Sequence, residues 1–204
     1  MNLFSSQLYK IMEWITRFAY LQLLWILFTL AGVTIAGIFP ATAALFSIMR
    51  DWLKGKREVR LFSAFSTYFK AEFWKSNLLG LVLLFITALM GIDLYFIQEY
   101  LGQSFSWLYI PWFALLITFS LFLSYVFPVF VYYDVRIGRV LKHSLLIMLI
   151  SPIQSVTMML SISMLCVLMW LVPALGFIFG APAAAFIMMW AGLHAFYRVD
   201  QKAG

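Results

Sequence analysis

Four long stretches of the chain contain no Asp, Glu, Lys or Arg, and short polar segments separate them. These stretches are residues 18–49, 76–92, 100–133 and 144–197, which hold 32, 17, 34 and 54 residues. A helix that crosses a bilayer needs about 20 apolar residues. The pattern therefore predicts five or six membrane-spanning helices and leaves little chain for a soluble domain.

The composition strengthens this interpretation. The chain is 65% hydrophobic and 11% charged, whereas soluble domains are about half apolar and about a quarter charged. A segment in lipid must satisfy its own backbone hydrogen bonds, and the alternating pattern of a membrane β-barrel is absent from this sequence. We therefore expect an all-α fold, a polytopic transmembrane helical bundle in which residues 1–204 form a single integral membrane domain.

The first uncharged stretch is too long for one upright crossing. Its 32 residues would span about 48 Å as a helix, against a hydrocarbon core of about 30 Å. Proline favours the first turn of a helix and disfavours helical structure just before it. We predict a hairpin: a helix over residues 9–36, a turn at 37–39, and a shorter helix from Pro40 to about Leu53. The alternative is a single kinked and tilted crossing.

The same logic predicts two further hairpins. The second pairs a helix over residues 76–98 with one over 106–133. The third pairs 144–170 with 173–197, since Pro173 marks a helix start. The expected bundle has six helices in three hairpins, or five spans if the first stretch crosses once.

The charges predict an orientation. All 14 Lys and Arg residues lie before the first stretch, within 50–75, within 136–142, or at the C-terminal end. The remaining connection carries Asp93 and Glu99 but no basic residue. Because cytoplasmic loops of membrane proteins are rich in Lys and Arg, we expect both termini to be cytoplasmic. The net charge of +6 thus reflects membrane topology, and we expect no nucleic-acid partner.

A stripe of phenylalanines occupies the basic segment between the first two hairpins. Its members, separated by three, four and four residues, are Phe62, Phe65, Phe69 and Phe73. This spacing places them on one face of a helix. Arg60 and Lys70 lie nearby and could reach anionic headgroups. We predict an amphipathic helix over about 59–75 that lies in the cytoplasmic interface and contacts membrane lipid. A docking surface for a partner protein is the alternative.

The chain offers little that could carry chemistry. It contains no recognisable nucleophile motif, phosphate-binding loop or metal-ligand spacing, so we expect no catalytic residues, no metal, no cofactor and no enzyme. The most prominent polar group within an apolar stretch consists of Ser151, Gln154, Ser155, Thr157 and Ser161. These side chains could line a solute path. Packing between helices explains the same residues and is the preferred interpretation.

The segment LYKIMEWITRFAYLQLLWILFTLAGVTIAGIFPATAALFSIMRDWL, followed by FKAEFWKSNLLG, resembles the YesL-like family of bacterial integral membrane proteins, which is classed as a domain of unknown function. The most specific elements are the turn at residues 37–40, Arg50 and Trp52. The resemblance implies a bacterial cell membrane and an association with carbohydrate-utilisation systems, including sugar ABC transporters. It supplies no binding or catalytic residues.

Two functions follow as hypotheses. The first is an accessory or regulatory partner of a carbohydrate uptake system, with sugar ABC transporter subunits as partners and the Phe-rich helix as the contact surface. The second is an autonomous small-solute transporter, acting as a homo-oligomer such as a homodimer, with its path near Ser151 to Ser161.

Overall fold

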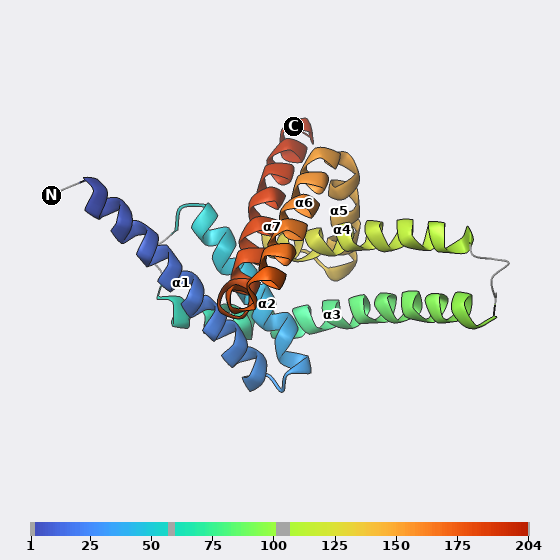
Figure 1. The fold of residues 1–204 in the computed structure, drawn as a ribbon, viewed down its shortest axis with the longest axis horizontal. Helices are drawn as coiled ribbons and strands as arrows, with labels where there is room; N and C mark the ends of the chain where they lie inside the picture. Colours follow the sequence, from blue (N-terminus) through green and yellow to red (C-terminus); the bar gives the residue numbers. More distant parts are fainter. Residues whose placement is uncertain (1–2, 57–59, 101–106, 204) are drawn as a thin grey trace.

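The structure, a computed structural model, describes residues 3–56, 60–100 and 107–203. Within these ranges the chain forms seven α-helices and no strand (Figure 1). The helices are α1 (Leu3–Ala31), α2 (Ile35–Leu53), α3 (Leu61–Tyr100), α4 (Tyr109–Tyr133), α5 (Ile137–Ile150), α6 (Pro152–Leu171) and α7 (Pro173–Ala203). The predicted all-α class is confirmed.

Five of the helices are long and apolar enough to cross a membrane. They are Ile11–Ala31 of α1, Leu61–Glu99 of α3, Tyr109–Tyr133 of α4, Pro152–Leu171 of α6 and Pro173–Arg198 of α7. The chain is therefore a multi-pass membrane protein built as a helical bundle. Helix α2 falls outside this set, and it contains the charged residues Arg50 and Asp51.

Helix α2 forms the centre of the bundle. It contacts α1, α3, α4 and α7, and its buried residues include Ala41, Ala43 and Ala44. Small side chains let neighbouring helices approach closely, which is the main source of packing energy between helices in lipid. The alanine-rich middle of α2 is thus suited to a position with neighbours on all sides.

The turn between α1 and α2 lies earlier than predicted. It occupies residues 32–34, where Val33 and Thr34 adopt positive φ angles of 60° and 52°, and α2 begins at Ile35 instead of Pro40. A Cβ atom on Gly37 would lie 2.3 Å from the Thr29 carbonyl oxygen. The predicted turn at 37–39 is therefore wrong: Gly37 serves close packing of α1 against α2, and Pro40 lies inside the helix.

Helix α3 is continuous where two elements were expected. Its 40 residues correspond to about 60 Å at 1.5 Å per residue, about twice the hydrocarbon thickness. The predicted separate interfacial helix over about 59–75 is therefore corrected: its described part is the first portion of α3, and residue 59 lies outside the described residues. Helix α3 contains two glycines, Gly80 and Gly91, and neither interrupts it; Gly80 packs against the Phe39 ring.

The predicted helix over 144–170 is interrupted in the structure. Helix α5 ends at Ile150 and α6 begins at Pro152, with Ser151 between them. Proline cannot donate the backbone hydrogen bond that would continue a helix, but it suits a first turn. The same rule correctly placed the start of α7 at Pro173.

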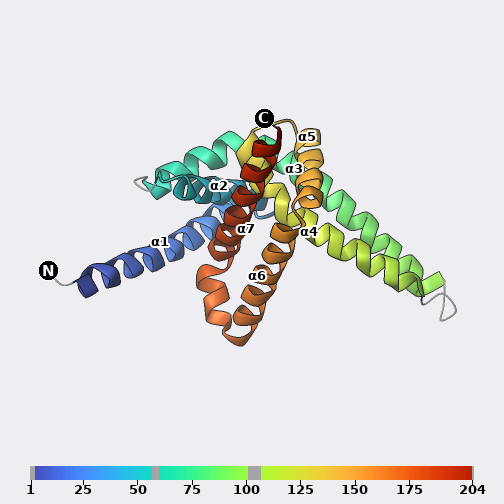
Figure 2. The ribbon, with the colours of Figure 1, turned by 90° about the horizontal axis from the view of Figure 1, so that it is seen from above.

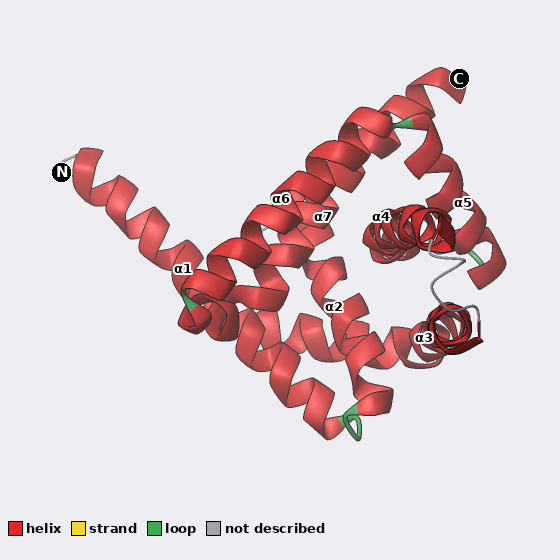
Figure 3. Ribbon diagram, turned by 45° about the vertical axis from the view of Figure 1, so that its right-hand side comes forward, coloured by secondary structure: helices red, strands yellow, loops and turns green. Residues whose placement is uncertain are grey.

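The helices point away from a shared core. Seen from above, α1 extends to the left, the α3–α4 pair extends to the right, and the α6–α7 pair points towards the bottom of Figure 2. Figure 3 shows α3 and α4 nearly end-on, with α5 beside α4. The largest fully buried side chains, Tyr125, Phe65 and Phe196, come from three different helices. The core therefore lies where the pairs meet around α2.

Candidate functional site

A charged cluster joins α2, α3 and α4 near the C-terminal ends of α2 and α4. We call Arg50, Asp51, Tyr68 and the Val131 carbonyl the Arg50 cluster. Arg50 Nη2 and Nε lie 3.1 and 3.2 Å from Asp51 Oδ1, and Arg50 Nη1 donates to the Val131 carbonyl. Tyr68 Oη donates to Asp51 Oδ2 at 2.5 Å. A half-buried ion pair needs such additional hydrogen bonds to offset the loss of hydration.

Two further polar contacts extend this cluster at the same end. The ammonium of Lys54 lies 4.4 Å from the centre of the Tyr132 ring, a cation–π geometry. Burial lowers the pKa of Lys54, the nearby Arg50 charge lowers it further, and the Asp51 carboxylate opposes this effect. Lys75 and Asp134 form an exposed ion pair at 2.9 Å. All these charged groups find partners within the protein, so they hold helices together and present no reactive group.

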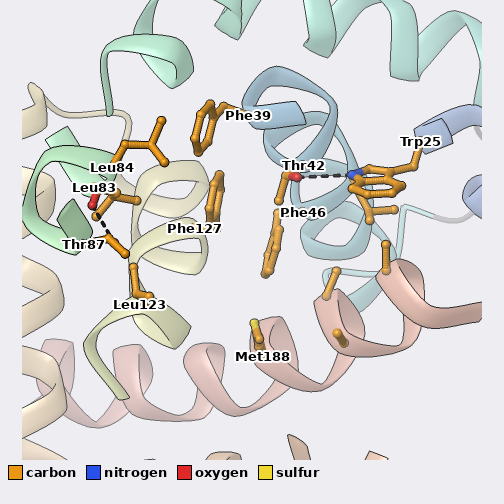
Figure 4. A pocket seen from close by; sticks show the side chains of 14 residues that line it. Trp25, Phe39, Thr42, Phe46, Leu83, Leu84, Thr87, Leu123, Phe127 and Met188 are labelled. Atoms are coloured by element: carbon orange, nitrogen blue, oxygen red, sulfur yellow. Dashed lines mark hydrogen bonds between the residues drawn. The ribbon is translucent and has the colours of Figure 1, made fainter. Parts of the chain in front are cut away.

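An apolar cavity of about 440 Å³ lies among α1, α2, α3, α4 and α7 (Figure 4). We call it the central cavity. Its lining includes Phe46 and Phe127, whose rings stack at 5.6 Å. The few polar atoms are satisfied internally, because Trp25 Nε1 donates to Thr42 Oγ1 at 3.2 Å and Thr87 Oγ1 donates to the Leu83 carbonyl at 2.9 Å. The central cavity therefore suits a hydrocarbon group better than a polar solute.

The phenylalanine stripe packs mainly against the protein. Phe65 is fully buried, Phe69 and Phe73 are half-buried, and only Phe62 is exposed. The Phe28 ring on α1 lies 5.1 Å from both Phe65 and Phe69. The expectation that Phe65 contacts lipid or a partner is therefore corrected. Arg60 and Lys70 are exposed, as a surface role requires.

The predicted polar path is divided between two sides of α6. Ser151, Gln154 and Ser155 are buried, whereas Thr157 and Ser161 are exposed. Ser155 Oγ lies 3.1 Å from Tyr125 Oη on α4 and 3.1 Å from the carbonyls of Met148 and Ser151. Thr157 instead bonds to the Gln154 carbonyl of its own helix. The five side chains do not form one continuous lining.

Two features escaped the sequence analysis. The proximity of Arg198 to Gln154 depends on the packing of α7 against α6, and the pairing of Arg50 with the Val131 carbonyl spans 81 residues. The adjacent charges Arg50 and Asp51 at the end of an apolar stretch could have indicated a polar contact at this position, but not its partner on α4. Among the described residues no group of three or more His, Cys, Asp or Glu side chains is placed to hold a metal ion.

Comparison with known proteins identifies the family. A family model described as "Protein of unknown function, DUF624" matches residues 18–94, a range that contains α2, the Arg50–Asp51–Tyr68 contacts and most of α3. The chain belongs to this family, because it is 36% identical over 196 residues to the uncharacterised protein YesL of Bacillus subtilis, covering 93% of this chain and 89% of YesL.

Two other Bacillus subtilis proteins are also similar. The uncharacterised protein YteU is 43% identical over 145 residues, covering 70% of this chain and 64% of YteU, so the matched region spans less than two thirds of that relative. The uncharacterised protein YesV is 28% identical over 202 residues, covering 97% of this chain and 95% of YesV. No solved structure matches the chain.

Proposed function

We propose that this protein is a non-catalytic subunit of the bacterial cell membrane that associates with a sugar ABC transporter and supports or regulates carbohydrate uptake. In this proposal both termini lie in the cytoplasm, as the distribution of Lys and Arg favours. The link to carbohydrate rests on the resemblance to the YesL-like family, whose members tend to accompany such systems.

The observation that carries the proposal is the separation of polar from apolar groups. The Arg50 cluster and the Lys75–Asp134 pair engage their charges at one end of the bundle, and the central cavity is lined by apolar side chains. A sugar route would need polar groups that bind hydroxyls along its length. The buried Ser155 hydroxyl contacts the Tyr125 hydroxyl and two backbone carbonyls, and none of these groups is a general base. These features favour a role through contact with another protein.

The exposed face at the start of α3 is the proposed contact surface. Lys70 and Trp74 are exposed, and the helical spacing of about 100° per residue places them opposite the buried Phe65 on α3. Arg60, the residue before α3, is exposed as well. Trp74 is 83% exposed, and tryptophan and arginine are enriched among residues that dominate protein interfaces. This face replaces the phenylalanine stripe as the surface available to a partner.

The test is co-purification from the native host grown on a complex carbohydrate. The tagged protein is extracted in mild detergent, and the permease subunits of a sugar ABC transporter are identified by mass spectrometry and by reciprocal capture. We expect the wild type to recover them. The double variant Lys70→Glu/Trp74→Ser should lose them because it removes both the charge and the aromatic anchor.

Trp170→Ser is the matched control. Trp170 is 82% exposed but lies near the end of α6, far along the chain from the proposed surface, so its replacement should leave recovery unchanged. Purification of the wild type without permease subunits would contradict the accessory role, and equal loss in the control would contradict the assigned surface.

A second candidate is an autonomous transporter that works as a homodimer. It is favoured by the buried polar side chains of Ser151, Gln154 and Ser155 at one position in the bundle. This function predicts solute uptake by the purified protein in liposomes and a loss of uptake in Gln154→Leu. Uptake unaffected by that change would exclude the assigned path, and the absence of uptake would leave the accessory role as the supported function.

A further inference from the structure

The start of α6 borders a small polar cavity. It measures about 220 Å³ and is lined by Ile150, Ser151, Pro152, Ile153, Gln154 and Arg198. We call it the α6 cavity. Figure 1 shows this start of α6 near the C-terminal end of α7 and beside the end of α5. Three helices thus contribute to a polar site outside the Arg50 cluster and the central cavity.

Ser151 supplies the first unengaged donor. Its residue surface is only 4% exposed, it lines the α6 cavity, and its hydroxyl makes no hydrogen bond to any residue that the structure describes. The buried side-chain polar atoms that lack a partner in the described chain are Thr29 Oγ1 and Trp52 Nε1, so the unpaired Ser151 hydroxyl is not sealed off and stays accessible from the α6 cavity. By contrast, the neighbouring Ser155 hydroxyl has three oxygen neighbours at 3.1 Å. The difference indicates that Ser151 has room for a ligand atom.

The backbone supplies two more donors. Because the chain breaks at Ser151 and α6 begins at Pro152, the N–H groups of Ile153 and Gln154 belong to the first turn of α6 and make no backbone hydrogen bond to the described residues of α5 before them. Within the described chain the first such bond runs from the Ser155 N–H to the Ser151 carbonyl at 3.1 Å. The N-terminus of a 20-residue helix also carries a partial positive charge. Such a terminus favours an anion.

Arg198 adds a full positive charge at the same position. In the amide orientation that pairs the two side chains, its Nη1 and Nε donate to the Gln154 side-chain oxygen at 3.1 and 3.2 Å. This contact fixes the guanidinium at the cavity while its Nη2 group remains available. Arg198 forms no ion pair with another described residue, and the lining contains no carboxylate. No carboxylate of the cavity lining therefore neutralises these donors.

We propose that the α6 cavity binds a phosphate group through Ser151, the first turn of α6 and Arg198. A tetrahedral phosphate offers several acceptor oxygens, which matches a set of donors that arrive from different directions, and arginine pairs strongly with phosphate. The phosphate belongs either to a lipid headgroup or to a soluble phosphate. This binding site goes beyond the accessory role proposed above and does not depend on it.

The experiment uses the full-length protein purified in a non-ionic detergent and washed free of lipid. Thermal unfolding is followed with increasing inorganic phosphate, with chloride at equal ionic strength, and with a short-chain phosphatidylglycerol. Ligands that bind the folded state raise the unfolding temperature. Native mass spectrometry in parallel detects any phospholipid that survives washing.

We expect phosphate-bearing probes to stabilise the wild type more than chloride does. Arg198→Gln should weaken this binding about tenfold or more, since it removes a charged hydrogen-bonding partner, and Ser151→Ala should weaken it by a smaller factor. Stabilisation by inorganic phosphate identifies a soluble ligand. Stabilisation by phosphatidylglycerol alone, with one retained phospholipid, identifies a lipid headgroup.

Two variants serve as controls for the loss of a charge and the loss of a hydroxyl away from the α6 cavity. Arg139→Gln removes an exposed charge from α5, and Ser161→Ala removes an exposed hydroxyl from α6, so both should bind as the wild type does. Arg198→Lys keeps the charge but not the fork and should give intermediate binding, which also serves if Arg198→Gln folds poorly. The proposal is overturned if neither probe exceeds chloride in the wild type, or if Arg198→Gln responds as the wild type does.

Discussion

Helices α2 and α6 are close in length, with 19 and 20 residues, yet their surroundings differ sharply. Eleven residues of α2 are buried, against three of α6. Helix α2 contains Gly37 and several alanines, while α6 contains neither glycine nor alanine. Since lipid tails are as apolar as leucine, hydrophobicity alone does not drive helices together in a membrane, and close approach at small residues does. Side-chain size therefore decides which helix becomes the core.

The largest expected effect comes from shortening one methionine on each helix. Met49 on α2 is fully buried, and Met164 on α6 is 77% exposed. Met49→Ala should lower the free energy of unfolding by about 3 kcal/mol, because it removes packed atoms and leaves a cavity. Met164→Ala should change it by less than about 0.5 kcal/mol. Equilibrium unfolding in mixed micelles measures both, and equal losses would contradict the comparison.

The next effect tests close approach itself. A Cβ on Gly37 would meet the backbone of α1, whereas a Cβ on Gly91 in α3 would meet no atom within 4 Å. Gly37→Ala should therefore destabilise the protein by about 2 kcal/mol through overpacking. Gly91→Ala should be neutral or slightly stabilising, since alanine favours helix by up to about 1 kcal/mol. The same unfolding assay applies, and a stable Gly37→Ala variant would refute the role given to this glycine.

A smaller effect separates the Arg50 cluster from the surface ion pair. The Asp51 side chain is 14% exposed and the Asp134 side chain is 77% exposed. Asp51→Asn should cost about 1.5 kcal/mol, because Arg50 and Tyr68 lose a charged acceptor. Asp134→Asn should cost less than about 1 kcal/mol, the usual range for exposed pairs. Chemical unfolding of the two variants at low salt measures both losses. A larger loss for Asp134→Asn than for Asp51→Asn would show that the Arg50 cluster adds little stability.

The smallest effect concerns the polar tie between α4 and α6. Tyr125→Phe removes the hydroxyl that contacts Ser155 and should cost about 0.6 kcal/mol, the average measured for hydrogen bonds between helices in membranes. Tyr197→Phe changes an exposed tyrosine and serves as the control. Thermal unfolding should show a loss of stability for Tyr125→Phe and none for Tyr197→Phe. A loss above about 2 kcal/mol for Tyr125→Phe would mean that α6 is bound to α4 more strongly than its exposed surface indicates.

Prolines marked helix starts correctly in one place and wrongly in another. Pro173 begins α7 as predicted, and Pro152 begins α6, but Pro40 lies inside α2. The three prolines have the same local preference. Pro40 is surrounded by buried residues, and packing around the central helix outweighs the single backbone hydrogen bond that a proline removes. No local pattern could report that packing.

Tertiary contacts also decided what the phenylalanine stripe packs against. Its spacing correctly indicated a helix with one apolar face. Whether that face meets lipid or protein depended on Phe28, which lies more than 30 residues earlier and packs against Phe65 and Phe69. The surface available to a partner was consequently on the opposite side of α3, around Trp74.

The sequence by itself determined that this is a helical, multi-pass membrane protein. The reason is local: each apolar segment in lipid must satisfy its own backbone hydrogen bonds, so length and hydropathy define the helices without reference to their neighbours. Only the tertiary structure decided that α2 is the core, that Arg50 pairs with α4, and that Arg198 lies beside Ser151. These features depend on close contacts between segments far apart along the chain, and such contacts leave no period or motif in any one of them.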